Sequence, residues 1–249
     1  MYSYAEALDL LKESSAKHQD EGGYEVQTPL KGLGLSLGGE IAGTAAALPV
    51  LALHHHRAKN NPHKLGSGLS REMHDVKKTM RELYPHMGDV GVRSTEELTG
   101  TPAMMQRIAD HYNPGSHKIM VASKSPEILA HELGHASGRN SILQRLATNK
   151  GLKNGGTIAG LGLLGHEDTR DYAAPVYAAS RLPLLMEEGR ASMRALKALH
   201  KLKGGKGISS GLKTLLPAFA TYAAPAVAGT AGIHYAANHL GHKGSKHER

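Results

Sequence analysis

The spacing of hydrophobic and polar positions changes character several times along the chain. Residues 1 to 23 place apolar side chains at helical intervals among acidic ones, which predicts an amphipathic helix. Residues 30 to 53 are apolar and rich in Gly and Ala, with Lys31 and Glu40 as their charges, and this stretch is about as long as a bilayer span. Residues 68 to 84 return to a charged helical pattern.

The middle of the chain mixes short strand patterns with helices. Residues 88 to 93 predict a short strand, residues 94 to 112 a helix, and residues 117 to 123 a second strand. Ser125 and Pro126 then supply the N-cap and the first-turn proline of another helix. We therefore expect a strand that leads directly into this helix.

Three apolar stretches follow in the second half. Residues 155 to 165 are too short to span a bilayer, and residues 172 to 186 are interrupted by Arg181 and Pro183. Residues 214 to 233 are twenty residues without a charge, although Pro217 and Pro225 lie inside. This segment is compatible both with membrane insertion and with a buried Ala/Gly helical hairpin.

Composition favours helices that pack through small residues, because the chain has 30 Gly, one Phe and no Trp. We expect a mainly helical α+β fold with a small sheet and additional Ala/Gly-rich apolar helices. The predicted organisation is an N-terminal segment over 1–67, a central domain over 68–205, and an apolar segment with a basic tail over 206–249.

The charge distribution suggests a partner class. The formal net charge is +8, and residues 187 to 249 carry 10 Lys and Arg against 3 Asp and Glu. This basic end could face a membrane or anionic lipid, or simply water. Nucleic acid is an unlikely partner because no aromatic residues interleave the basic ones. No N-terminal signal peptide is expected, because the N-terminus lacks a basic start followed by an apolar run.

The clearest chemical signal is the string HELGH at residues 131 to 135. On a helix, His131 and His135 lie one turn apart on the same face and can bind one metal ion. Glu132 projects about 100° away, where it can act as a general base toward metal-activated water. Because the chain has no Cys, any metal must be held by His, Asp or Glu. The alternative is a chance match in a chain with 17 His.

A third ligand is needed, and its position distinguishes classes of zinc peptidase. The metzincin pattern would require a third His or Asp where this chain has Ser141, and a serine hydroxyl is a poor zinc ligand. Downstream, Glu187 and Glu188 begin a strongly helical segment and are both candidates.

Residues 188 to 192, EGRAS, resemble the E-x-x-A-D signature of gluzincin peptidases, in particular the HtpX-like and CAAX-prenyl-endopeptidase family. The resemblance covers about residues 117 to 195. It implies a zincin-like core, a Zn2+ cofactor held by His131, His135 and Glu188, and Glu132 as general base. It favours Glu188 over Glu187, because Ala191 then occupies the family's alanine position.

The resemblance departs from the family at Ser192, which stands where the family has an aspartate that orients a ligating His. Ser192 could accept the imidazole N–H itself, or a carboxylate could come from elsewhere, the candidates being Asp168, Asp171 and Glu187.

Residues 165 to 172 form a polar insert between apolar stretches. Tyr172 or His166 could donate a hydrogen bond to a reaction oxyanion, although a charged loop that caps a helical hairpin is the plainer interpretation. We also expect a substrate peptide to pair with the strand near Ile119 to Ala122.

Two functional hypotheses follow. The first is a zinc-dependent endopeptidase, membrane-associated through its apolar helices, that acts on a protein or peptide substrate. The second is a membrane-active or structural protein, for example of a viral particle, in which the zinc site is vestigial or stabilising.

Overall fold

A computed structural model describes residues 69–94, 111–121, 125–166 and 168–239, together with Gly34, Leu35, Gly38, Gly39 and Ala42. In chain order, the described elements are α3 (Arg71–Leu83), η1 (Pro85–Met87), β1 (Gly91–Ser94), β2 (His111–Asn113), β3 (Lys118–Val121), α5 (Pro126–Ser137), α6 (Ile142–Ala147), α7 (Lys150–Leu163), η3 (Arg170–Tyr172), α8 (Ala173–Lys203) and α9 (Gly205–His239).

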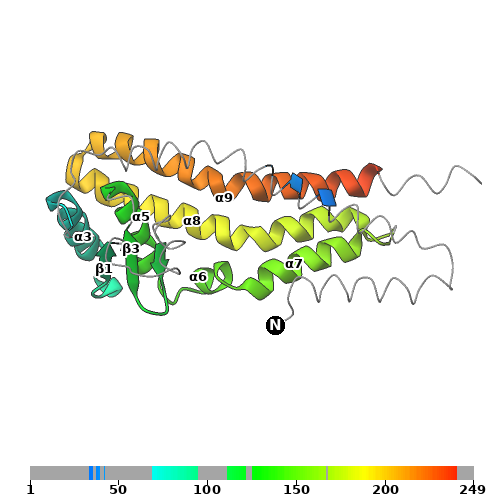
Figure 1. The fold of residues 1–249 in the computed structure, drawn as a ribbon, viewed down its shortest axis with the longest axis horizontal. Helices are drawn as coiled ribbons and strands as arrows, with labels where there is room; N and C mark the ends of the chain where they lie inside the picture. The colour runs from blue at the N-terminus through cyan, green and yellow to red at the C-terminus, as the bar shows by residue number, and fades with distance from the viewer. Residues whose placement is uncertain are drawn as a thin grey trace, which may run out of the picture.

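A long helical hairpin forms the axis of the molecule. Helices α8 and α9 lie side by side and are joined by a tight turn at Gly204, whose φ of 58° is readily adopted by glycine (Figure 1). Close approach begins directly after the turn, because a Cβ at Gly207 would fall on the backbone carbonyl of Leu199. The expected packing of helices through small residues is therefore present in this hairpin.

The sheet has three strands in the order β1-β3-β2, with β1 parallel and β2 antiparallel to β3. Strand β2 corrects the prediction of a helix up to residue 112. The turn after it explains the difference, because the side-chain oxygen of Asn113 accepts hydrogen bonds from the backbone N–H groups of Gly115 and Ser116. Residues 95 to 110 of that predicted helix lie outside the described part of the chain.

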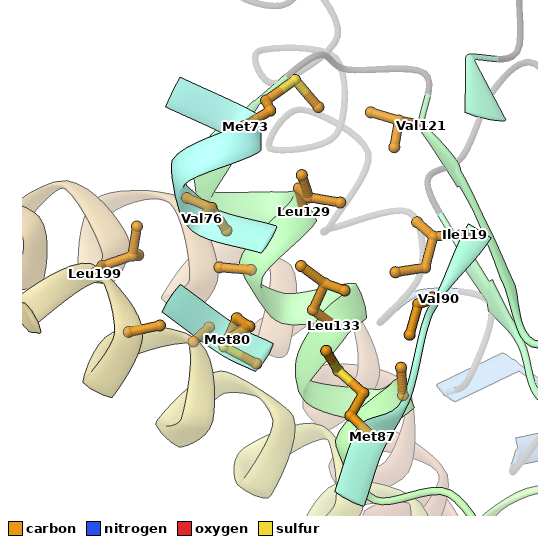
Figure 2. Close-up of a cluster of buried hydrophobic side chains, with 14 of the residues drawn as sticks. Met73, Val76, Met80, Met87, Val90, Ile119, Val121, Leu129, Leu133 and Leu199 are labelled. Carbon is orange, nitrogen blue, oxygen red and sulfur yellow. The ribbon is translucent and has the colours of Figure 1, made fainter. Parts of the chain in front are cut away.

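The main hydrophobic core lies where α3, the sheet and α5 meet the end of α8 (Figure 2). Met80 from α3, Ile119 from β3, Leu133 from α5 and Leu199 from α8 are all completely buried. A second cluster at the far end of the hairpin joins α7, the start of α8 and the end of α9. Between these clusters α8 buries polar side chains, namely Ser180, Arg181, Glu187 and Glu188.

The helices begin where the sequence provides polar caps. The side chain of Ser70 accepts a hydrogen bond from the backbone N–H of Met73, and that of Ser125 accepts one from Ile128. The predicted helix over 68–84 and the predicted capped helix after Ser125 are therefore confirmed. The two predicted strands also form, as β1 and β3.

The fold class is a mainly helical α+β structure with a small mixed sheet, as the sequence predicted. Residues 214 to 233 lie inside α9, which packs along α8. Within the described ranges, no helix is both long enough and apolar enough to span a membrane. Residues 1 to 33 and 43 to 67 lie outside the described part, so the predicted domain boundaries stay a prediction.

The contact between α5 and α8 depends on Gly134. A Cβ at this position would meet the backbone carbonyl of Ala191, so any side chain forces the two helices apart. We expect Gly134→Ala to lower the free energy of unfolding by about 1–3 kcal/mol. Chemical denaturation in the presence of a chelator measures this without a contribution from bound metal.

Gly155→Ala in α7 is the matched control, because nothing lies within 4 Å of a Cβ built there. Alanine should stabilise that exposed helical position by about 0.5–1 kcal/mol. Equal stability changes in the two variants would contradict the close-approach role of Gly134.

Candidate metal centre

Helix α5 presents the HELGH residues toward α8. Its C-terminal end is held by hydrogen bonds from three side chains to its last carbonyls: Arg194 Nη1 donates to Gly134, Gln144 Nε2 donates to His135, and His86 Nε2 lies 2.9 Å from the carbonyl oxygen of Ser137. These contacts come from α8, α6 and η1. The orientation of α5 is therefore fixed from several directions.

Three donor atoms converge at the contact between α5 and α8. His131 Nε2 lies 3.2 Å from both Glu188 Oε2 and His135 Nε2, and His135 Nε2 lies 3.5 Å from Glu188 Oε2. The two imidazole rings are nearly perpendicular, with an interplanar angle of 87°. His131 and His135 thus meet Glu188, which follows His131 by 57 positions in the sequence, at one point between the two helices.

These separations match what one tetrahedral ion requires. Donors that bind zinc at its usual distance of ~2.0–2.2 Å lie about 3.3–3.6 Å from each other. Two imidazole nitrogens and a carboxylate oxygen are also a donor set that zinc accepts. His131, His135 and Glu188 therefore fit a metal ion in both chemistry and spacing.

Glu187 and Glu188 lie at different positions around the two imidazole rings. Ser192 Oγ lies 3.2 Å from His131 Nδ1, so the serine stands where a hydrogen bond can orient that ring. Glu187 Oε1 lies 3.6 Å from His135 Nδ1, on the side of the ring that faces away from the metal position. Glu188 is the glutamate whose carboxylate converges with both Nε2 atoms, and Glu187 places a carboxylate behind the His135 ring.

Burial and neighbouring charges shift the pKa values of His135 and Glu188. Burial lowers the pKa of His135, but Glu187 and Glu188 more than reverse this effect and raise the pKa to about 10. Burial conversely raises the pKa of Glu188, and the two histidines lower it to about 2. Metal binding must therefore displace a proton from His135.

Glu132 is buried on α5, with 8% of its surface exposed. It is absent from the group of converging donors, yet its charge contributes to the raised pKa of His135. The carboxylate thus lies near the site without occupying a ligand position, as the HELGH spacing predicted.

Tyr222 on α9 is a feature of the site that the sequence did not reveal. Burial raises the pKa of its hydroxyl, and the charges of Glu188 and Glu132 raise it further. Tyr222 follows Glu188 by 34 positions, within a stretch whose Ala-rich composition carries no motif. The hairpin, which folds α9 back along α8, brings this residue close enough to feel the charges of Glu188 and Glu132.

The polar insert at 165 to 172 is not part of this centre. Tyr172 lies just before α8 and precedes Glu188 by 16 positions, or ~24 Å along a helix. His166, Asp168 and Asp171 lie in or before the same turn. The structure therefore does not bring these four residues to the metal ligands, and Tyr172 is 63% exposed.

The expected peptide-binding strand is also corrected. Ile119 on β3 is paired with Val92 of β1 on one side and with Tyr112 of β2 on the other. The central position of β3 leaves no free edge there for a substrate peptide. Ala122 lies outside the described residues. The edge strand that contacts α5 within the described sheet is β2.

Gly134 lies between the two histidines of the HELGH string, and its missing side chain faces the backbone of Ala191. Its small size serves the approach of α5 to α8 and so brings the histidines to Glu188.

Comparisons with protein families, with curated proteins and with solved structures found no match to this chain. The assignment of the site therefore depends on its own geometry. That geometry is a buried group of two His and one Glu, consistent with an HExxH…E arrangement of the zincin type.

Glu188→Ala and Glu187→Gln should affect metal binding differently. Loss of Glu188 removes a donor atom, so Glu188→Ala should lower the affinity for zinc more than a substitution of any neighbouring residue does. Loss of the Glu187 charge should weaken zinc by about 10–100-fold, the usual effect of a residue that orients a ligand. Competition titration with a chromophoric chelator measures both affinities.

Glu82→Gln serves as a control, because Glu82 pairs with Lys201 on the surface and should leave zinc affinity unchanged. Circular dichroism establishes that each variant is folded. Near-normal zinc affinity in Glu188→Ala, together with loss of binding in Glu187→Gln, would show instead that Glu187 is the ligand and Glu188 is not.

Proposed function

We propose that this protein is a zinc-dependent endopeptidase. The observation that carries the proposal is the convergence of His131, His135 and Glu188, whose donor atoms lie 3.2–3.5 Å apart. A zinc ion held there would polarise the scissile carbonyl and lower the pKa of water toward neutrality.

Glu132 is proposed as the general base. It lies directly after a metal ligand on α5, is buried, and is not itself a ligand. Its carboxylate would take a proton from the attacking water and deliver it to the leaving amine.

Tyr222 is proposed as the hydrogen-bond donor to the oxyanion, in place of Tyr172 and His166. Burial and the neighbouring carboxylates raise the pKa of its hydroxyl, so the proton stays on the oxygen at neutral pH. A protonated hydroxyl beside the site can donate to a negative charge that develops on the carbonyl oxygen.

The substrate is proposed to be a protein or peptide in extended conformation. Both sides of β3 are occupied, so the edges of the described sheet are β1 and β2, and β2 is the edge strand that contacts α5. A peptide could add to this edge through main-chain hydrogen bonds, which recognise an extended backbone independently of side chains.

Glu132→Gln should retain zinc and lose cleavage. The amide keeps the volume of the carboxylate but cannot accept the proton, so kcat should fall by about 10²–10⁴-fold. Cleavage of a proteome-derived peptide library, read by mass spectrometry, measures activity, and elemental analysis measures zinc per chain.

The same two assays also test the alternative hypothesis, a structural protein with a stabilising zinc site. A folded wild-type protein that binds zinc but cleaves no peptide would indicate a stabilising metal site that ties α5 to α8. Equal cleavage by wild type and Glu132→Gln would refute the proposed role of Glu132.

Tyr222→Phe should lower kcat by about 10²–10³-fold with little change in KM, because the hydroxyl acts on charge that develops in the transition state. Zinc content should not change. Tyr235→Phe is the matched control, since Tyr235 lies on the same helix and stacks on His239. Unchanged kinetics in Tyr222→Phe would remove Tyr222 from the mechanism.

A further inference from the structure

One face of the α8/α9 hairpin exposes large apolar side chains on both helices. We define the hairpin face by its six residues: Leu182, Met186 and Met193 on α8, and Leu212, Leu216 and Val227 on α9. Their exposed fractions range from 45% to 67%. Isolated exposed apolar residues are common on protein surfaces, whereas several of them gathered on two neighbouring helices suggest an interaction site.

Helical spacing places each set of three in one stripe. The spacings between Leu182, Met186 and Met193 are four and seven positions, which are close to one and two turns of a helix. Leu212, Leu216 and Val227 are separated by four and eleven positions and also lie on one side of α9. Each helix therefore contributes a row of apolar side chains.

A groove lies between the two helices where one end of each row meets the other, at Leu182 and Val227. It has a volume of about 620 Å3, and Leu182 from α8 and Val227 from α9 both line it. Most other lining residues are also apolar, among them Leu185 and Ala226. Pro183 and Pro225 lie inside these helices beside the groove, where each removes a backbone N–H donor. The hairpin face is thus an apolar surface with a shallow apolar channel.

Glu187 and Glu188 beside Met186 are buried, and the part of the hairpin that follows them carries charge of one sign. From residue 189 to residue 239 the chain contains no Asp or Glu. Its basic residues are Arg190, Arg194, Lys197, Lys201, Lys203, Lys206 and Lys213. Arg194, Lys201 and Lys203 are engaged with α5 and α3.

Three of the remaining bases border the two rows. Arg190 and Lys197 are exposed beside Met193 on α8, and Lys213 is exposed beside Leu212 on α9. Long basic side chains can extend from the edge of an apolar surface and place their charges at the height of lipid headgroups.

We propose that the hairpin face binds the surface of an anionic phospholipid membrane. Apolar side chains would enter the boundary between headgroups and acyl chains, and the groove would receive acyl-chain segments. The bordering Arg and Lys would pair with lipid phosphates. The hairpin would then lie in the plane of the membrane.

The basic residues at the border favour an anionic membrane over a second copy of the chain as the partner of the hairpin face. Two hairpin faces in contact would bring like-charged borders together, and no carboxylate between residues 189 and 239 could offset the repulsion. An anionic bilayer complements both the apolar rows and their basic edges. The proposal is independent of peptidase activity, because no ligand of the metal centre belongs to the hairpin face.

Vesicle co-sedimentation tests the proposal with the full chain. Wild type should bind vesicles of phosphatidylcholine mixed with phosphatidylglycerol, bind vesicles of phosphatidylcholine alone more weakly, and lose binding as salt rises. Val227→Asp and Leu182→Asp should each abolish binding. Arg190→Glu combined with Lys213→Glu should weaken it by at least about fivefold per reversed charge.

Matched controls lie on other elements. Ile142→Asp changes a side chain on α6 that is 78% exposed, and Lys150→Glu with Lys153→Glu reverses two charges on α7. These variants should bind vesicles as wild type does, and zinc content with thermal melting should show that all variants are folded.

Wild type that stays in the supernatant with both kinds of vesicle would overturn the proposal. Binding that Val227→Asp and Leu182→Asp leave unchanged would do the same. Light scattering that shows a wild-type dimer dispersed by Val227→Asp, without vesicle binding, would assign the hairpin face to a second copy instead.

Discussion

The structure depends on the burial of several charged groups where α5 meets α8. Glu132, Glu187 and Glu188 are each less than 10% exposed, and they surround two imidazoles. Buried carboxylates are costly unless positive charge compensates them. Protonated histidine can do so in part, as the raised pKa of His135 shows, but a divalent cation between Glu188 and the two imidazoles does so more completely. The site is thus built to hold positive charge.

Two close contacts between helices bring these groups together. Gly134 allows α5 to reach the backbone of α8, and Gly207 allows α9 to fold closely back on α8. The first contact places the histidines beside Glu188, and the second brings Tyr222 toward the same point. The high Gly and Ala content therefore serves helix contact, and the large aliphatic side chains concentrate in the core around the sheet.

Local signals could be predicted from sequence. Ser125 and Pro126 marked the start of α5, the HELGH spacing marked one face of that helix, and Ala191 pointed to Glu188 as the partner. Each of these depends on helical periodicity or on capping, which act over a few residues. The mainly helical α+β class followed from the same patterns.

Features set by contacts between distant segments could not be predicted in this way. The order of strands in the sheet placed β3 at the centre, because β2 forms where helical periodicity had suggested the end of a helix. Tyr222 reaches the site only through the hairpin, and Tyr172 fails to reach it because α8 is one long helix. No short sequence pattern carries such information.

Zinc K-edge X-ray absorption spectroscopy on the purified protein tests the central claim most directly. The account predicts one zinc per chain with nitrogen and oxygen donors at ~2.0–2.2 Å and the outer-shell scattering of two imidazole rings. A folded protein that retains no zinc after reconstitution, or a zinc spectrum without imidazole scattering, would contradict it.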